Sequence, residues 1–193
     1  MITGIEILKF GVEDRATSNK FLTDFGLHKV ESDLENTDLF QTQNGSKVYV
    51  FDVADQRLPA AIEAGSTLRE VTWGVKTADD LVHLGNNIAD VAGFKRTDTT
   101  VQCIDPNGMT NIFQLSITHD VPEISSVGIN QYGNIQRVNA ASPVYDKGQP
   151  VAIGHVVFFT PDLAKTEQFY IEKFGFHLSD AYRNRGAFLR CRG

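Results

Sequence analysis

The chain contains an internal repeat, which constrains its possible fold more than any other feature of the sequence. When the sequence is shifted by 149 positions, residues 5–28 align on residues 154–177 without a gap. Identical residues stand at five of the 24 aligned positions: Phe10, Thr17, Phe25, Gly26 and His28 lie opposite Phe159, Thr166, Phe174, Gly175 and His177. A third copy matches at a shift of 83, because residues 77–79 (Thr-Ala-Asp) repeat residues 160–162 (Thr-Pro-Asp). The repeat indicates three related units.

Each unit is expected to begin with a strand followed by a helix. In the last unit, Ala152–Phe159 is rich in β-branched and aromatic residues, which predicts a strand. The next three residues resemble a helix start: Thr160 is the expected N-cap, and Pro161 suits the first helical position. Gly175 is expected to end this helix in a left-handed conformation.

Apolar residues at helical spacing mark the expected buried faces of the helices. The last unit has Leu163, Thr166, Tyr170 and Phe174, and the first unit has Phe21 and Phe25 at equivalent positions. The middle unit has Leu81, Leu84, Ile88 and Val91 between a strand at Val71–Val75 and a helix break at Gly93.

Two turn motifs predict hairpins after the first two helices. Asn44-Gly45 separates the expected strands Leu39–Thr42 and Ser46–Asp52, and Asn-Gly favours a tight hairpin turn. Residues 105–108 (Asp-Pro-Asn-Gly) separate Val101–Ile104 from Asn111–Ile117, and their proline, asparagine and glycine suit a turn.

These elements predict an α+β protein made of tandem βαβββ modules. Two complete modules, at 2–55 and 66–118, would form an N-terminal domain at 1–118. Residues 119–150 are expected to be a linker, because they are rich in Ser, Asn, Gly and Pro and lack periodicity. Residues 151–193 would begin a C-terminal domain with an incomplete third module. Its missing strand suggests either a shortened sequence or a strand supplied by another chain, so we expect a homo-oligomer.

The composition excludes several classes of partner. The net charge is −6, from 18 basic and 24 acidic residues, with no basic stripe for a nucleic acid. No apolar run is long enough to cross a membrane, and the first residues do not resemble a signal peptide. The two cysteines, Cys103 and Cys191, are too few for a disulfide framework and are expected to be core thiols. A cytoplasmic protein is therefore expected.

The repeated βαβββ pattern, the Phe-Gly helix ends and the Asp-Pro-Asn-Gly turn together resemble the vicinal oxygen chelate superfamily. This superfamily includes glyoxalase I, the bleomycin resistance proteins and the type I extradiol dioxygenases. Two units, a linker and a third unit that begins Ile-Gly-His-Val-Val-Phe-Phe-Thr-Pro-Asp look most like the two-domain extradiol dioxygenases. In those enzymes the N-terminal pair of modules is usually metal-free, and the C-terminal pair holds Fe(II) or, less often, Mn(II).

The resemblance implies that His155 is a metal ligand, because the family's first ligand is a histidine in the opening strand of the third unit. Strand alternation puts His155, Val157 and Phe159 on one face and Val156 and Phe158 on the other, toward the helix. A non-haem Fe(II) site needs two histidines and one carboxylate. By family analogy, the other two ligands would follow Gly193. Without the resemblance, a lone histidine on an apolar strand is more often a half-buried, hydrogen-bonded residue.

The equivalent positions in the first two units predict no metal there. The repeat puts Glu6 and Thr72 opposite His155, and Gln114 stands where the family's glutamate ligand closes a unit. Together these residues offer one carboxylate and no imidazole, which is a poor donor set for a transition metal. We therefore expect the N-terminal half to be structural or to shield the substrate.

The leading functional prediction is the N-terminal part of an extradiol dioxygenase that cleaves a catecholic aromatic substrate with O2. The resemblance implies that the metal lowers the pKa of a bound substrate hydroxyl and holds the substrate beside O2. We expect the chain as given to be inactive, because two ligands are missing. Two alternatives are a glyoxalase-like metal-dependent isomerase or lyase, and a metal-free binding protein of the bleomycin-resistance kind. In the latter, Phe10, Phe40, Trp73 and Phe113 would line the pocket, although they are as well suited to the core.

Overall fold

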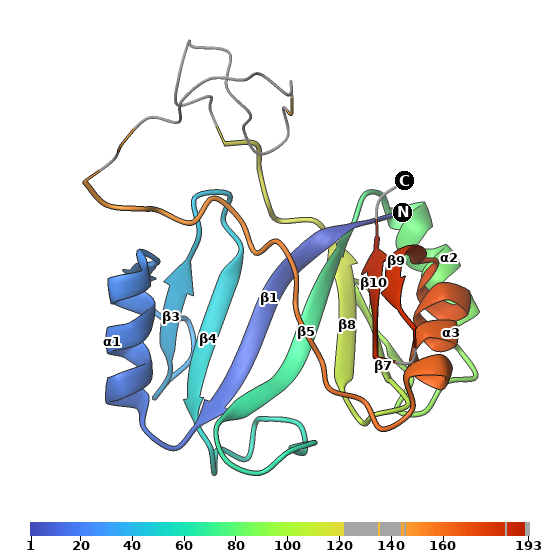
Figure 1. Cartoon of the computed structure of the whole chain (residues 1–193), viewed down its shortest axis with the longest axis horizontal. Helices are drawn as coiled ribbons and strands as arrows, with labels where there is room; N and C mark the ends of the chain where they lie inside the picture. The colour runs from blue at the N-terminus through green and yellow to red at the C-terminus, as the bar shows by residue number, and fades with distance from the viewer. Residues whose placement is uncertain (122–134, 136–143, 145, 184, 192–193) are drawn as a thin grey trace.

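The computed structural model describes residues 1–121, 135, 144, 146–183 and 185–191 of the 193-residue chain. A curved eight-stranded sheet forms its centre, and a separate two-stranded sheet lies near the C-terminus (Figure 1). The first unit consists of β1 (Ile2–Val12), α1 (Arg15–Phe25), β2 (His28–Val30), β3 (Asp38–Gln41) and β4 (Lys47–Asp52). The second consists of β5 (Thr67–Val75), α2 (Ala78–Asn87), β6 (Lys95–Arg96), β7 (Thr100–Ile104) and β8 (Thr110–Leu115). The last contains α3 (Leu163–Phe174), β9 (His177–Tyr182) and β10 (Gly186–Arg190).

The order of the strands makes the first two units equivalent halves of one sheet. The order is β2-β3-β4-β1-β5-β8-β7-β6, so each unit contributes four adjacent strands. The opening strand pairs in parallel with the last strand of its own unit, β1 with β4 and β5 with β8. The two opening strands, β1 and β5, pair with each other antiparallel at the centre. The predicted α+β class and the βαβββ order of the first two units are confirmed.

Both predicted hairpins are present. β3 and β4 pair antiparallel across the Asn44-Gly45 turn, and Gly45 has a φ of +89°. β7 and β8 pair antiparallel across residues 105–109, where the Oδ1 atom of Asp105 accepts hydrogen bonds from the backbone N–H groups of Asn107 and Met109. The carboxylate of Asp105 thus closes the turn that its sequence predicted.

The helix ends follow local capping chemistry, with two corrections to the sequence prediction. α3 ends at Gly175 in the left-handed region, as predicted, and α2 begins with a capping box between Thr77 and Asp80. The N-cap of α3 is Asp162 rather than Thr160, because the Asp162 side chain accepts from the backbone of Lys165. α2 ends at Asn87, six residues before the expected Gly93 break.

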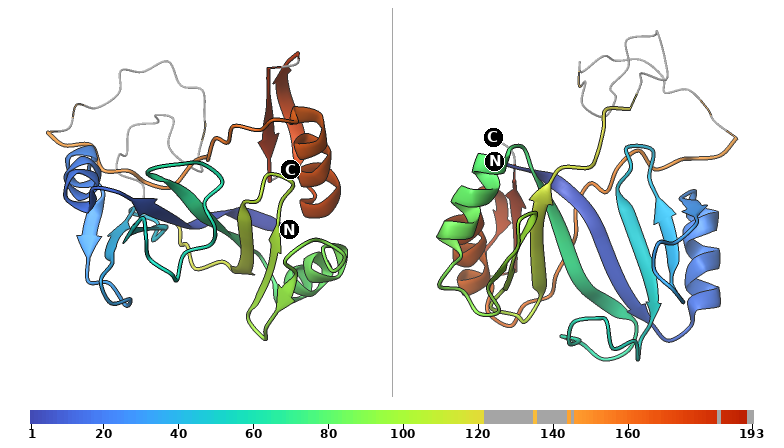
Figure 2. Two further views of the ribbon diagram at one scale, coloured as in Figure 1. Left: turned by 90° about the horizontal axis from the view of Figure 1, so that it is seen from below. Right: turned by 180° about the vertical axis from the view of Figure 1, so that it is seen from behind.

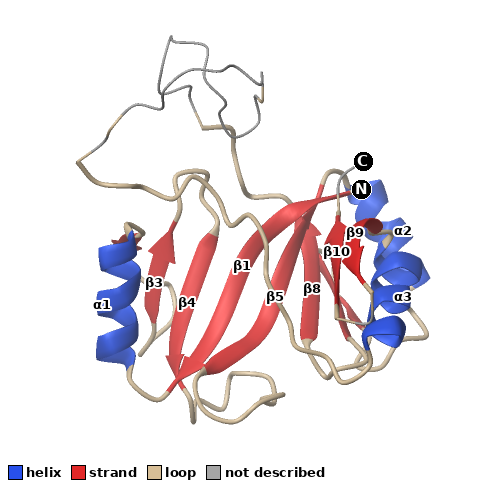
Figure 3. Cartoon of the chain, in the orientation of Figure 1, coloured by secondary structure: helices blue, strands red, loops and turns tan. Residues whose placement is uncertain are grey.

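The predicted strand at Ala152–Phe159 is not a strand in the structure. Residues 150–160, here called the crossing segment, run in an extended path across the sheet in front of β1 and β5 without joining a ladder (Figures 1 and 3). An opening strand of this fold pairs with its own unit's last strand and with the next opening strand. In the described residues, neither partner exists for the crossing segment, so its backbone has no ladder to join.

The side chains of the crossing segment nevertheless alternate as predicted. Val156 and Phe158 pack against the main hydrophobic core. His155 is exposed, and Val157 and Phe159 remain 78% and 84% exposed. The pleat of a strand is therefore kept without strand pairing.

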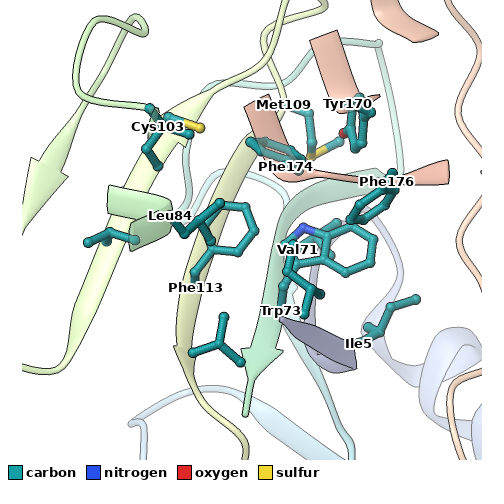
Figure 4. Close-up of a cluster of buried hydrophobic side chains, with 14 of the residues drawn as sticks. Ile5, Val71, Trp73, Leu84, Cys103, Met109, Phe113, Tyr170, Phe174 and Phe176 are labelled. Carbon is teal, nitrogen blue, oxygen red and sulfur yellow. The ribbon is translucent and has the colours of Figure 1, made fainter. Parts of the chain in front are cut away.

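The main core lies on the face of the sheet that the helices cover, here called the helix face, and it joins the second unit to the third. Trp73 and Phe113 from the sheet contact Tyr170, Phe174 and Phe176 from the last unit (Figure 4). The Trp73 and Phe176 rings meet edge-on with centroids 5.2 Å apart, and the Phe113 and Phe174 rings do so at 4.8 Å. Burying each such aromatic side chain contributes roughly 1.5–3 kcal/mol, so this cluster holds α3 against the sheet.

The first helix is buried less than its periodicity predicted. Phe21 and Phe25 are each 62% exposed and stack on one another with centroids 5.9 Å apart, so the prediction of a buried Phe21–Phe25 face is wrong. α1 lies at one end of the sheet and contacts the core through Leu22 instead. Tyr170 and Phe174, the repeat equivalents of these phenylalanines, are buried because they pack both against the second unit and against Phe176 of their own unit.

Candidate functional site

His155 is the one metal ligand that the sequence predicts, and the structure places it on the exposed side of the crossing segment. Its neighbours on that side are Val157 and Phe159. No group of three or more His, Cys, Asp or Glu side chains suited to a metal ion occurs among the described residues. The ligand role of His155 thus stays a prediction.

Glu6, the repeat equivalent of His155 on β1, is a fully buried carboxylate whose oxygens are occupied by hydrogen bonds. Oε1 accepts from the hydroxyl groups of Ser116 (2.7 Å) and Thr118 (3.2 Å). Oε2 accepts from the backbone N–H groups of Ile117 and Thr118, both at 3.0 Å. Four donors on one buried carboxylate match the number of lone-pair positions that it offers, so this side chain is used in full by the chain itself.

Gly74 on β5 leaves the space that the Glu6 carboxylate occupies. A Cβ atom at position 74 would lie 2.8 Å from Cδ of Glu6 and closer still to its Oε1. The backbone of Gly74 does not have a positive φ, so glycine is needed here for space rather than for conformation. Sequence analysis placed Glu6 at a position equivalent to the metal ligand, and it missed that Glu6 and Gly74 form one arrangement.

Thr72 and Gln114, the other ligand-equivalent residues, lie on adjacent strands near Glu6. Thr72 is buried and pairs with Ile7 of β1, while Gln114 is half-buried and pairs with Gly74. The sheet therefore brings the three predicted positions together. The groups that it brings together are the hydrogen-bonded carboxylate of Glu6, the hydroxyl of Thr72 and the amide of Gln114.

Several other charged groups of the first unit form ion pairs. Lys9 and Glu70 meet at 2.8 Å, and Asp38 pairs with Arg15 and Lys29. Burial opposes ionisation of Asp38, but hydrogen bonds from Asn19, Lys29 and Arg15 outweigh it and lower the pKa of Asp38 to about 2. These contacts are structural ion pairs.

The aromatic residues proposed for a binding pocket belong mainly to the core. Phe40 and Phe113 are fully buried, Trp73 donates an indole hydrogen bond to Asn111 (2.8 Å), and Phe10 is half-buried between two clusters. Of the two alternatives left open for Phe40, Trp73 and Phe113, the structure therefore supports the core role. Cys103 is also buried as expected, which raises the pKa of its thiol to about 12.

A cleft of about 290 Å³ lies between α2 and the last unit. His83, His177 and Cys191 are among its lining residues, above an apolar floor that includes Leu84 and Phe174. The described residues of this cleft supply no group of donors that could hold a metal ion.

Sequence and structure comparisons relate this geometry to known proteins. Residues 152–193 match the model of the Glyoxalase/Bleomycin resistance protein/Dioxygenase superfamily. No curated protein matches the chain by sequence. No helix among the described residues has the length and apolar character needed to cross a membrane.

Several solved structures share the fold of the chain. One is a Mn(II)-bound glyoxalase from Novosphingobium aromaticivorans, with a TM-score of 0.69 and 18% identity over 98% of this chain and 58% of that one. A second is BphC, a halotolerant catechol dioxygenase, with a TM-score of 0.70 and 20% identity over 100% of this chain and 62% of that one. A third is the 2,3-dioxygenase LapB from Pseudomonas sp. KL28, with a TM-score of 0.67 and 17% identity over 98% of this chain and 66% of that one. The chain thus spans less than two thirds of the length of each.

Proposed function

We propose that this chain, which has the fold of the vicinal oxygen chelate superfamily, is part of an extradiol dioxygenase. The resemblance to the superfamily is confirmed by the family match at residues 152–193 and by the shared fold. The finer proposal is that the whole protein cleaves a catecholic aromatic substrate with O2 at an Fe(II) centre. Dioxygenases among the structural neighbours support it.

The exposed position of His155 is the observation that carries this proposal. The residue lies within the segment that the superfamily model matches, and the crossing segment directs it away from the core. Glu6, at the equivalent position of the first unit, is directed into four internal hydrogen bonds. The same place in the repeat is thus used for internal support in the first unit and left available in the third.

The described residues do not by themselves fit a complete Fe(II) centre. They offer one imidazole at His155, whereas a facial site takes two histidines and a carboxylate. No reaction step is therefore assigned to this part of the chain beyond the contribution of one neutral imidazole. In our proposal the other two ligands belong to the remainder of the whole protein.

A glyoxalase-like metal-dependent isomerase or lyase is the second candidate. The Mn(II)-bound glyoxalase has nearly the same TM-score as the catechol dioxygenase, 0.69 against 0.70. The binding protein of the bleomycin-resistance kind is less well supported, because Phe40, Trp73 and Phe113 are core residues. Self-association remains a further proposal, since the two-stranded β9–β10 sheet has no other partner strand in the described residues.

The direct test is His155→Ala in the whole protein, purified and reloaded with Fe(II). We expect iron content and O2-dependent catechol cleavage to be lost, because a site of three ligands loses most of its affinity with one of them. The matched control is His177→Ala, which removes another exposed histidine of the same unit. Unchanged cleavage by His155→Ala would refute the proposal, and Mn(II)-dependent turnover without O2 uptake would favour the second candidate.

A further inference from the structure

We infer that two hairpin turns, one from each of the first two units, clamp the crossing segment and set which of its side chains face outward. Asn107 is then a positioning residue for His155. The use of that position for a metal rests on the proposed function, but the clamp itself does not.

The first anchor holds the beginning of the crossing segment on the turn between β3 and β4. The backbone N–H groups of Gln43 and Asn44 donate to the carbonyl groups of Pro150 (3.0 Å) and Val151 (2.9 Å). The Gln43 side chain donates to the carbonyl of Gln149 at 3.1 Å. All three bonds are accepted by main-chain carbonyl groups, so they fix the path of the backbone and not merely one side chain.

Asn44 keeps this first anchor rigid. It is buried, and its side-chain Oδ1 accepts from the backbone N–H of Ser46 (3.1 Å) and from the hydroxyl groups of Ser46 (2.9 Å) and Thr42 (2.7 Å). The N–H groups that hold Pro150 and Val151 therefore come from a turn whose own geometry is tied down.

The second anchor holds the end of the crossing segment on the turn between β7 and β8. Asn107 Oδ1 accepts from the hydroxyl of Thr160 at 2.7 Å and from that of Thr166 at 3.3 Å, and its Nδ2 lies 3.2 Å from Thr166 Oγ1. In the same turn, Asp105 Oδ2 accepts from the Tyr170 hydroxyl at 3.0 Å. One turn thus binds both the end of the crossing segment and helix α3.

The two anchors are equivalent hairpin turns of the two units, and the crossing segment runs from one to the other over the helix face (Figures 1 and 2). His155 lies between them, four residues after Val151 and five before Thr160. Ile153 contacts both hydrophobic clusters of the helix face, so the segment also fills the space between them.

The clamp matters because a slip of one residue in an extended segment exchanges its two faces. From residue 155 to 159 the outward side chains are His155, Val157 and Phe159, and the inward ones are Val156 and Phe158. A slip would turn His155 toward the core and expose Val156. Since no ladder fixes the register here, the anchors and the inward side chains must do so.

Thiol labelling measures which side chains of the crossing segment face outward, and it needs neither metal nor substrate. In a Cys191→Ser background, where Cys103 is buried, single variants His155→Cys and Val156→Cys are labelled with a thiol reagent in the folded protein. We expect position 155 to react at least about tenfold faster than position 156, because labelling follows exposure of the thiol. Equal labelling rates at positions 155 and 156 would contradict the outward direction of residue 155 and the inward direction of residue 156 that the structure shows.

The clamp is then tested by repeating both measurements in Asn107→Ala and Asn107→Asp. Asn107→Ala should bring the ratio toward one, whereas Asn107→Asp should keep it, because a carboxylate still accepts from both threonine hydroxyl groups. Asn86→Ala is the matched control, since it removes an asparagine that bonds Arg96 and not the last unit. Thr160→Val gives a second, milder break of the same anchor if Asn107→Ala does not fold.

An unchanged ratio in both Asn107→Ala and Thr160→Val would overturn the clamp. Equal loss in Asn107→Ala and Asn107→Asp would also overturn it, because the acceptor would not be what matters. This test is independent of the proposed function. If the labelling ratio depends on Asn107 as expected but His155→Ala retains full catechol cleavage, the clamp is supported and the metal-ligand role of His155 is refuted.

Discussion

Replacing Gly74 with alanine is the most informative single change to the first two units. The added Cβ would lie 2.8 Å from Cδ of Glu6, a distance at which the carboxylate must move. Moving it breaks hydrogen bonds from Ser116, Ile117 and Thr118 while leaving a charge in a fully buried position. Stranding a buried charge in this way costs about 3–5 kcal/mol. For a chain of this size that corresponds to a fall in Tm of roughly 10 °C.

Urea unfolding of a double-mutant cycle tests this reasoning. Gly74→Ala should cost about 3–5 kcal/mol in the normal chain and about 2 kcal/mol less in a Glu6→Ala background, where the carboxylate is absent and only the Thr3 hydroxyl, 2.5 Å from the added Cβ, must still move. Gly186→Ala is the control, because a Cβ at this strand glycine would meet nothing within 4 Å. An equal cost of Gly74→Ala in both backgrounds would show that the carboxylate is not what the methyl group displaces.

Three further outcomes follow from the same contacts. The pKa of Asp38 is lowered to about 2, below that of the unfolded chain, so this carboxylate stabilises the fold above about pH 4, and this stabilisation is lost as the pH falls toward 2. Asp38→Asn should therefore remove about 2 kcal/mol of the pH dependence of the unfolding free energy in acid. An unchanged dependence of stability on pH below 4 would contradict this. Phe176→Ala should uncover Trp73, the single tryptophan, and shift its fluorescence to the red while costing about 3–5 kcal/mol; a constant emission maximum would mean that the ring contact does not shield the indole. Burial raises the pKa of both Tyr49 and Tyr170, and the neighbouring carboxylates of Asp33 and Asp105, respectively, raise it further. Ultraviolet titration should therefore show both phenols ionising only when the chain unfolds. Ionisation of both near pH 10 in the folded state would refute the burial of these side chains.

Local chemistry allowed most of the fold to be predicted from the sequence. The turns at Asn44-Gly45 and Asp105–Gly108, the Thr77 cap and the Gly175 helix end depend on residues a few positions apart, so their signals lie within short windows. Periodicity also gave the correct inward side for Tyr170 and Phe174.

The errors arose where the outcome depends on distant partners. Phe21 and Phe25 have the same spacing as Tyr170 and Phe174, but only the latter pair is covered by Trp73 and Phe113 of another unit. Ala152–Phe159 has the composition of a strand but lacks a partner among the described residues. Propensity specifies what a segment prefers, and tertiary contacts decide whether the preference is met.

The candidate site could be predicted as positions but not as arrangements. The repeat placed Glu6 on β1 and Thr72 on β5, the opening strands of their units, whereas His155 lies on the unpaired crossing segment instead of in a strand. It gave no sign that residues 116–118 would occupy Glu6, because that contact joins positions more than 100 residues apart. A signal was present in the hydroxyl residues Ser116 and Thr118, which flank an exposed Ile117 just after β8.

The crossing segment has a consequence for the order of folding. Its anchors belong to different units, and its hydrogen bonds join residues as far apart as Gln43 and Pro150, a separation of 107 positions. Such contacts close long loops, and they lower the free energy of the chain only after both hairpins have formed. They are therefore expected to form after the rate-limiting step of folding. Weakening Asn107 should therefore accelerate unfolding and leave the refolding rate nearly unchanged. The part of the chain that presents His155 would then be the last to assemble and the first to be released.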